Sequence, residues 1–189
     1  MNSFRYNLIQ CVEILKTGGL ILYPTDTIWG IGCDATNEKA VEKIYQLKKR
    51  PGEKDMIVLV ADEKEIVQYV EGPNHRIFEY LQQTSKPTTV IYQKAKSLAE
   101  NLIGKDGSIA IRICKDEFCR QLINAFGKPI VSTSANISGA AAPQNFRQVD
   151  ETIKNRVDYI VTYRQDDEQE AQPSSVIKWE DGKIIVIRP

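Results

Sequence analysis

The sequence predicts an α/β fold: a single domain, residues 1–189, built on a twisted open mixed sheet with helices on its faces. Apolar β-branched stretches alternate with apolar residues at helical spacing through most of the chain, which is the α/β pattern. Two further apolar stretches flank Asp181-Gly182, a strong hairpin signal, so parallel and antiparallel strands should share the sheet. A length of 189 residues, with 42% hydrophobic and 26% charged residues, suits one domain with a substantial core.

The first half of the chain carries clear helix and strand signals. Apolar residues recur at helical spacing from Leu8 to Leu15, and Gly18-Gly19 ends that run. Thr36 is the expected N-cap of a second amphipathic helix, which Pro51 terminates. The predicted helices are 5–17, 36–50, 62–70 and 74–83, and the predicted strands are 20–23 and 56–60.

The second half of the chain repeats the alternation. The predicted strands are 88–92, 108–114, 129–131, 159–162, 176–179 and 184–187, and the predicted helices are 116–126 and 147–157. The segment 165–172 is acidic and almost free of apolar residues, so we expect a mobile loop there. No internal repeat or linker divides the chain, which favours one domain.

The charge and hydropathy patterns narrow the classes of function. The 25 basic and 25 acidic residues cancel, so nucleic acid could bind only through a local basic patch. No apolar run approaches the roughly 20 residues that span a bilayer, and Met1–Tyr6 lacks the features of a secretory signal. We therefore expect a cytoplasmic protein that does not enter a membrane.

Metal binding and nucleophilic catalysis have little support among the residues present. The four cysteines form no C-x-x-C pair and His75 is the one histidine, so we expect reduced thiols and no metal site. A Ser-His-Asp or Cys-His mechanism would have to use His75. The Gly-Pro-Asn-His-Arg context of His75 instead indicates the start of a helix at the surface.

A polar segment follows the apolar strand predicted at 129–131. Ser132–Ser138 contains four hydroxyls and one amide, and Gly139 ends it. Small polar side chains after a buried strand are what an open α/β sheet offers a ligand at its edge. More often, such residues form a turn that hydrogen-bonds to its own backbone. The segment by itself leaves both interpretations open.

Further polar clusters lie at the ends of predicted elements. They are Tyr23–Thr27, Lys48–Arg50, Ser108 with Arg112, and Ser174-Ser175. The cations at the end of the second helix could serve only to stabilise the helix dipole. Arg112 is more informative, because an arginine on a strand of isoleucine and alanine is costly to bury unless it meets an anion. It shares one face of its strand with Ser108.

Neither of the standard glycine-rich phosphate loops is present. Phosphate would therefore have to bind through Lys48, Arg50, hydroxyls and backbone N–H groups. Taken together, the residues predict an anionic ligand in a groove that is lined by hydroxyls and a few cations.

Five segments, in order along the chain, resemble the motifs of the YrdC/Sua5 family. They are Leu22–Asp34 (the opening signature), Lys48–Pro51 (K-x-R-P), Ser108–Arg112 (the strand ending in arginine), Ser132–Gly139 (the S-x-N loop) and Pro173–Val176 (the proline-serine-threonine segment). The resemblance spans residues 20–188. Each motif alone is weak, but five in the same order are specific.

The resemblance implies a YrdC/RibB-like sheet with a large concave groove and an L-threonylcarbamoyladenylate synthase, which is a nucleotidyltransferase. Such enzymes join L-threonine, bicarbonate and ATP into threonylcarbamoyl-AMP and release pyrophosphate. Their product feeds t6A modification of adenosine 37 in tRNA through a threonylcarbamoyl transferase complex. Mg²⁺ is expected with ATP, without a dedicated protein cage. The chain resembles the short, TsaC-like form of the family.

The resemblance also assigns site residues. Thr25, Arg112 and Ser174 would hold threonine, with Arg112 taking its carboxylate in a fork. Lys48 and Arg50 would act in catalysis by stabilising the transition state. The residues expected to hold ATP are Lys48, Arg50, Ser108, Ser132, Ser134, Asn136 and Arg188.

Two departures from the family pattern bear on threonine selectivity. Lys54-Asp55-Met56 stands where many members have Asn-Pro-Leu, and Leu59 stands where Sua5-type members have a histidine near threonine.

Three alternative functions remain. They are a YciO-like paralogue, the carbamoyl-adenylate-forming domain of hydrogenase maturation proteins, and a non-catalytic module that binds tRNA or double-stranded RNA. The intact Ser134-Ala135-Asn136 favours the synthase over a YciO-like protein. Zero net charge and the lack of an aromatic stacking platform disfavour the RNA module.

Overall fold

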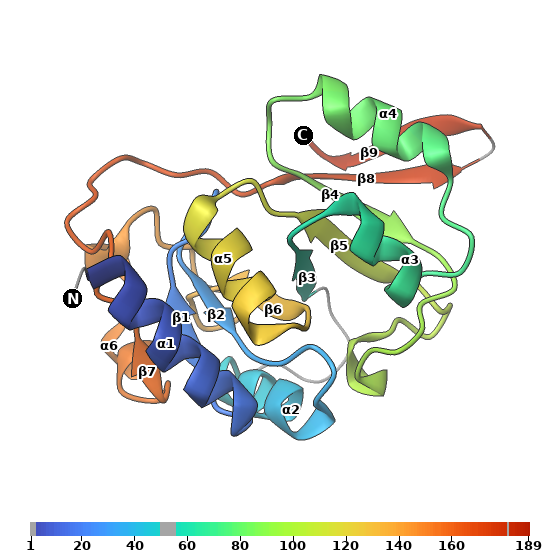
Figure 1. Ribbon diagram of the computed structural model, residues 1–189. Coiled ribbons are helices and arrows are strands. Elements are labelled where there is room, and N and C mark those ends of the chain that lie inside the picture. Colours follow the sequence, from blue (N-terminus) through green and yellow to red (C-terminus); the bar gives the residue numbers. More distant parts are fainter. Residues whose placement is uncertain (1–2, 50–55, 181) are drawn as a thin grey trace.

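One nine-stranded sheet organises the computed structural model, which describes residues 3–49, 56–180 and 182–189 (Figure 1). From one edge to the other its strands are β7 (Tyr159–Ile160), β1 (Ile21–Tyr23), β2 (Gly30–Gly32), β6 (Ile130–Ser134), β3 (Ile57–Val60), β5 (Ile109–Ile113), β4 (Thr88–Tyr92), β8 (Ser175–Glu180) and β9 (Lys183–Arg188). The pairs β1–β7, β3–β5 and β4–β8 are parallel, and the other neighbouring pairs are antiparallel. The predicted mixed sheet is therefore confirmed.

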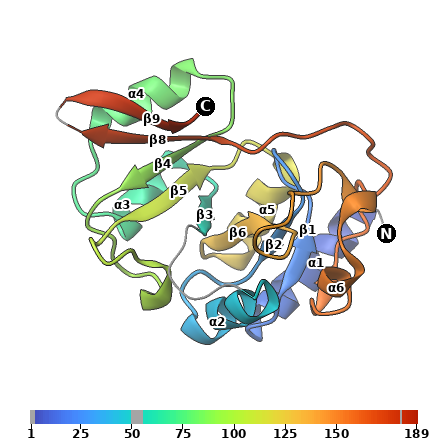
Figure 2. The ribbon, with the colours of Figure 1, turned by 180° about the vertical axis from the view of Figure 1, so that it is seen from behind.

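Helices cover both sides of this sheet. They are α1 (Ser3–Lys16), α2 (Glu38–Leu47), α3 (Ile66–Tyr69), α4 (His75–Gln83), α5 (Glu117–Phe126) and α6 (Glu151–Lys154), with the 3-10 turns η1 (Glu63–Glu65), η2 (Glu100–Leu102) and η3 (Phe146–Gln148). Helices α1 and α5 lie side by side in Figure 1, and α2 and α6 come to the front when the molecule is turned in Figure 2. The C-terminal hairpin β8–β9 extends the sheet at the edge far from α1.

Helix α5 shows how the sequence fixes an element. Asp116 caps its N-terminus by accepting a hydrogen bond from the Cys119 backbone N–H at 2.9 Å. Gly127 ends it in the left-handed region, with φ of +76°, which glycine adopts without a steric penalty. Phe118 and Leu122 point from the helix into the core.

The first half differs from the prediction in the cap of α2, in a missed strand, and in the predicted helix 62–70, which divides into η1 and α3. Asn37, and not Thr36, caps α2, because its side chain accepts from the Ala40 backbone N–H at 3.2 Å. Thr36 instead donates its hydroxyl to Asp34 at 2.6 Å. The sequence analysis also missed β2, since a glycine-isoleucine-glycine strand lacks the β-branched run that marks a strand.

The second half holds two larger differences. The predicted helix 147–157 is wrong as one element: it divides into η3 and α6, because Asp150 is extended and caps α6 through the Thr152 backbone N–H. The predicted strand 159–162 shortens to β7. Strand β6 is longer than the predicted 129–131 and runs to Ser134, so Ser132 and Ser134 belong to the strand.

The histidine lies where the sequence predicts it, at the start of a helix on the surface, and the cysteines are unpaired as expected. His75 begins α4 and is exposed. All four cysteines are free and buried. Burial raises the pKa of the Cys11 thiol to about 12 and holds that of Cys33 still further above its ordinary value. Within the described part of the chain, no helix is long and apolar enough to cross a membrane.

Leu122→Ala should lower the free energy of unfolding by about 3 kcal/mol, because the side chain is fully buried and its removal leaves a cavity in the core. Val67→Ala, at a half-exposed position of α3, is the matched control and should cost less than about 0.5 kcal/mol. Urea denaturation monitored by circular dichroism measures both. Similar costs for the two variants would contradict the core position of α5.

Candidate functional site

A cavity of about 890 Å³ lies against one face of the sheet and is large enough for a drug-sized ligand. Two residues predicted to bind ATP, Ser108 and Arg188, line it. Ser108 directly precedes β5 and is half-buried, while Arg188 ends β9. The apolar part of the wall is formed by Tyr45, Met56, Ile57, Ile91, Leu102, Ile103, Val176 and Ile187.

The strand register places a third predicted residue, Ser132, on the same face. Ser132 pairs with Ile57, and Ile57 pairs in turn with Ala110. Residues directly opposite one another in neighbouring strands project to the same side of a sheet. Since Ile57 and Ala110 line the cavity, the side chains of Ser132 and, two residues on, Ser134 belong to its face.

Gly30 allows Thr25 and Ser132 to approach one another. A Cβ atom on Gly30 would lie 3.0 Å from the Ser132 hydroxyl oxygen and 3.6 Å from the Thr25 methyl group. The Thr25 hydroxyl donates to the Ile28 carbonyl at 2.8 Å and accepts from the Thr27 backbone N–H at 3.0 Å, so it fixes the turn after β1. A predicted threonine-binding residue and a predicted ATP-binding residue therefore meet across a glycine.

Arg112 forms a buried ion pair with Asp26. Its Nη2 lies 3.0 Å from the Asp26 carboxylate, and the two side chains are 3% and 10% exposed. Asp26 also accepts a hydrogen bond from the Lys115 backbone N–H at 3.3 Å. Among the described residues, neither Nε nor Nη2 of Arg112 has a hydrogen-bond partner. The guanidinium is thus held by charge, with unused donors.

Ser174 connects β4, the neighbour of β5 in the sheet, with Arg188 near the C-terminus. Its buried hydroxyl lies 2.8 Å from that of Thr89 on β4. Its carbonyl accepts from Nε and Nη2 of Arg188, at 3.1 and 2.9 Å. Thr89 also lines the cavity. The fork of Arg188 is therefore positioned at the cavity wall by the segment that carries Ser174.

Lys48 lies at the C-terminal end of α2 and is 2% exposed. Its ammonium donates to the carbonyl oxygens of Ser134 and Asn136, the latter at 2.7 Å. The Asn136 amide donates to the carbonyls of Ile137 and Ala140, at 3.2 and 2.6 Å, which is the self-bonded turn that small polar residues commonly make. Lys48 consequently holds the shape of the segment 134–136.

The predicted site residues thus form three connected groups. Thr25 meets Ser132, Ser174 meets Arg188, and Lys48 meets Ser134 with Asn136. Arg50 lies outside the described residues, as do Lys54 and Asp55 of the departure from the family pattern.

The sequence analysis gave no role to two residues of this site, Asp26 and Thr89. The signal for Asp26 was present, because a buried arginine requires an anion and Asp26 follows a strand within a predicted polar cluster. Thr89 gave no signal apart from its place in a β-branched strand.

The Cys119 thiol, which contacts the turn after β1, is a poor nucleophile. Burial raises the pKa of the Cys119 thiol well above its usual value, and the neighbouring Cys114 raises it further, so this sulfur stays protonated near neutral pH. Its thiol donates to the Pro24 carbonyl at 3.3 Å. In the described ranges, no cluster of three or more His, Cys, Asp or Glu side chains could hold a metal ion.

Comparison with known families gives a consistent result. A model of the Sua5/YciO/YrdC family, described as "Telomere recombination", matches residues 13–189. The chain is 37% identical over 153 residues to a threonylcarbamoyl-AMP synthase of Saccharophagus degradans, which covers 79% of this chain and 80% of that protein. It is 33% identical over 155 residues to a protein of the same name from Vibrio campbellii, with 80% and 83% covered.

Solved structures resemble the fold closely. P. abyssi Sua5 complexed with L-threonine superposes with a TM-score of 0.86 at 23% identity, over 98% of this chain and 54% of that one. E. coli YciO superposes with a TM-score of 0.83 at 25% identity, over 98% of this chain and 89% of that one. The predicted fold and family resemblance are confirmed.

Asp26→Asn should lower the free energy of unfolding by about 3 kcal/mol, because it leaves the Arg112 charge buried and unpaired. Adding Arg112→Met to that variant removes the orphaned charge and should recover part of the loss. A double-mutant cycle by urea denaturation measures the coupling. Additive effects of the two substitutions would show that the pair contributes no coupling energy.

Proposed function

The chain belongs to the Sua5/YciO/YrdC family, and from this premise we propose that it is an L-threonylcarbamoyladenylate synthase. One structural observation carries the proposal: the buried Arg112 lies two residues along β5 from Ala110, which lines the cavity, and its Nε and Nη2 have no hydrogen-bond partner among the described residues. A free amino acid presents the carboxylate that such a guanidinium fork recognises. The synthase names of relatives at 33–37% identity support the same reaction.

In the proposed reaction, the amino group of threonine and bicarbonate form a carbamate and release one water molecule. A carbamate oxygen attacks the α-phosphorus of ATP, so an O–P bond forms while the bond to the leaving pyrophosphate breaks. The protein then needs to align the reactants and stabilise the charge on the phosphates, and it needs no covalent intermediate. This requirement suits a site whose thiols are buried and whose histidine lies on an exposed helix start.

Threonine would be held near Arg112. In the proposal its carboxylate takes the free donors of Arg112, and the hydroxyls of Thr25 and Ser174 contact the rest of the molecule. Each hydroxyl is already oriented, Thr25 by the Ile28 carbonyl and Ser174 by Thr89. Preorganised groups of this kind lose little entropy when the substrate binds.

ATP would occupy the cavity beside them. Its base and ribose would lie against the apolar wall, and its phosphates would contact Ser108, Ser132, Ser134 and Arg188. Lys48 would hold the segment 134–136 in place through the carbonyls that it binds, and so position the Asn136 amide near the phosphates. Its ammonium would also bring a positive charge to them. Arg50 is assigned to the phosphates by the family motif alone.

Mg²⁺ would enter this site bound to ATP. The described residues form no carboxylate cluster that could cage a metal ion, so the phosphates would supply most of its ligands. The ion would neutralise phosphate charge, and this chain's own cations would supply the rest.

The proposed product, threonylcarbamoyl-AMP, would pass to a transferase complex that modifies adenosine 37 of tRNA, in the cytoplasm. A direct contact with tRNA or double-stranded RNA belongs to the same proposal.

Pyrophosphate release from ATP should depend on both L-threonine and bicarbonate. A coupled phosphate assay after pyrophosphatase treatment measures it, with L-alanine in place of threonine as the control. Release at the same rate with and without threonine would favour a YciO-like protein. Binding of tRNA that weakens steeply with salt, without any nucleotide turnover, would favour the RNA-binding module.

Arg112→Lys should raise the KM for threonine by about 30-fold while the KM for ATP changes by less than about threefold, because a lysine keeps the charge but lacks the fork. Arg156→Lys, at an exposed position, is the matched control. Steady-state kinetics at saturating ATP measures the effect, after circular dichroism has verified the fold. An unchanged KM for threonine would contradict the role of Arg112.

A further inference from the structure

A second cavity, of about 580 Å³, lies at the carboxyl ends of the parallel strands β3 and β5. Ala61 and Asp62 follow β3 directly, and Ile113–Lys115 end and follow β5. In open α/β sheets, ligands bind in the crevice outside the carboxyl ends of parallel strands. The position of this cavity therefore marks it as a candidate binding site in its own right.

This cavity and the proposed ATP cavity lie on opposite faces of β4. Successive residues of a strand project to opposite sides. Thr89 and Ile91 line the first cavity, whereas Thr88 lines the second. No residue is shared between the two walls. A ligand in the second cavity need not displace ATP.

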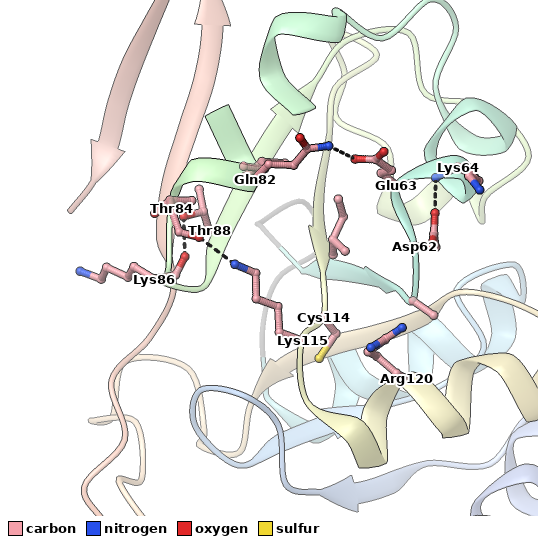
Figure 3. A pocket seen from close by; sticks show the side chains of 13 residues that line it. Asp62, Glu63, Lys64, Gln82, Thr84, Lys86, Thr88, Cys114, Lys115 and Arg120 are labelled. Atoms are coloured by element: carbon pink, nitrogen blue, oxygen red, sulfur yellow. Dashed lines mark hydrogen bonds between the residues drawn. The ribbon is translucent and has the colours of Figure 1, made fainter. Parts of the chain in front are cut away.

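Cations from separate segments surround the second cavity. They are Lys64 of η1, Lys86 before β4, Lys115 after β5 and Arg120 of α5. Figure 3 shows the Lys115 ammonium next to Thr84 on one side of the pocket and the Arg120 guanidinium next to Cys114 on the other, while Lys64 and Lys86 lie on opposite sides of its rim. The floor is apolar and includes Ala61, Leu81 and Ile113.

The acidic residues of the wall do not neutralise these cations. Asp62 accepts a hydrogen bond from the Lys64 backbone N–H at 2.8 Å and so caps η1. Glu63 accepts from the Gln82 amide at 3.4 Å (Figure 3). Across the described ranges, no carboxylate forms an ion pair with the four cations of this wall. Four cations thus face two acids in a chain of zero net charge.

Lys115 is the best oriented of the four. Its ammonium donates to the Thr84 carbonyl at 2.7 Å, which fixes the side chain across the pocket mouth and leaves further N–H donors for an anion (Figure 3). Arg120, one turn into α5, presents a planar fork from the other side. An ammonium that is oriented by a neutral carbonyl and keeps further N–H donors can bind a phosphate group.

We propose that this cavity binds a small organic phosphate, with its phosphate on the Lys115 ammonium, Arg120 adding positive charge to the wall, and its apolar part on the floor. The volume is in the range of small-molecule sites, and the combination of an apolar floor with a few polar groups is typical of them. The inference goes beyond the proposed synthase activity and does not depend on it.

Titration of the isotope-labelled protein with inorganic phosphate, at constant ionic strength and with saturating ATP present, tests the proposal. Amide resonances of residues 61–64, 84 and 113–115 should shift and saturate. The double variant K115Q/R120Q should bind phosphate at least about tenfold more weakly, because the lost charged hydrogen bond to Lys115 alone costs on the order of 1.4 kcal/mol. The matched control is K39Q/R156Q, which removes one exposed lysine and one exposed arginine elsewhere.

Three outcomes would overturn the proposal. Shifts that never saturate would show nonspecific screening. Shifts confined to residues around Ser108 and Arg188 would show that phosphate binds only in the first cavity. An equal loss of affinity in K39Q/R156Q would show that net charge, and not this pocket, attracts the anion. Because the readout is binding in the wild-type protein, it stands whether or not the synthase assay succeeds.

Discussion

The ion pair between Arg112 and Asp26 is the constraint on which the candidate site depends. It joins the turn after β1 to the end of β5, although β2, β6 and β3 lie between these strands in the sheet. Removing both charges from water is expensive, and the pair offsets this cost only because the charges meet at 3.0 Å. Asp26 also accepts a hydrogen bond from the Lys115 backbone N–H. One carboxylate therefore connects the turn after β1 with the end of β5 and with the segment that leads from β5 to α5.

This arrangement leaves the guanidinium both immobile and incompletely bonded. A fully hydrogen-bonded arginine would have no donors left for a ligand, and an unpaired one would be too costly to bury. Carbonyl oxygens orient two further cations nearby, since Lys48 donates to the Asn136 carbonyl and Arg188 to the Ser174 carbonyl. A carbonyl is neutral, so it orients Arg188 without cancelling its charge. The site therefore keeps its positive potential for an anionic substrate.

Local patterns in the sequence were sufficient for most of the fold, because strands such as β3 and β4 are apolar and β-branched and helices such as α5 carry their own caps. These patterns did not predict β2, because packing and not strand propensity defines that strand. Its glycines leave room for the side chains of Tyr23 and Ser132. The sequence motifs identified the candidate residues, but they did not indicate which of these residues contact one another. The contact of Ser174 with Thr89, like that of Arg112 with Asp26, joins segments that are distant in the sequence.

The alternation of β4 separates two chemical environments with a single strand. Thr89 and Ile91 line the cavity with Ser108 and Arg188, and Thr88 lines the cavity with Lys115 and Arg120. Both environments meet at Asp26, whose carboxylate contacts the Arg112 side chain and the Lys115 backbone. An anion that displaced Lys115 would therefore act on the residue that holds Arg112. Because the carboxylate is shared, the two faces of the sheet are physically connected even though their walls have no residue in common.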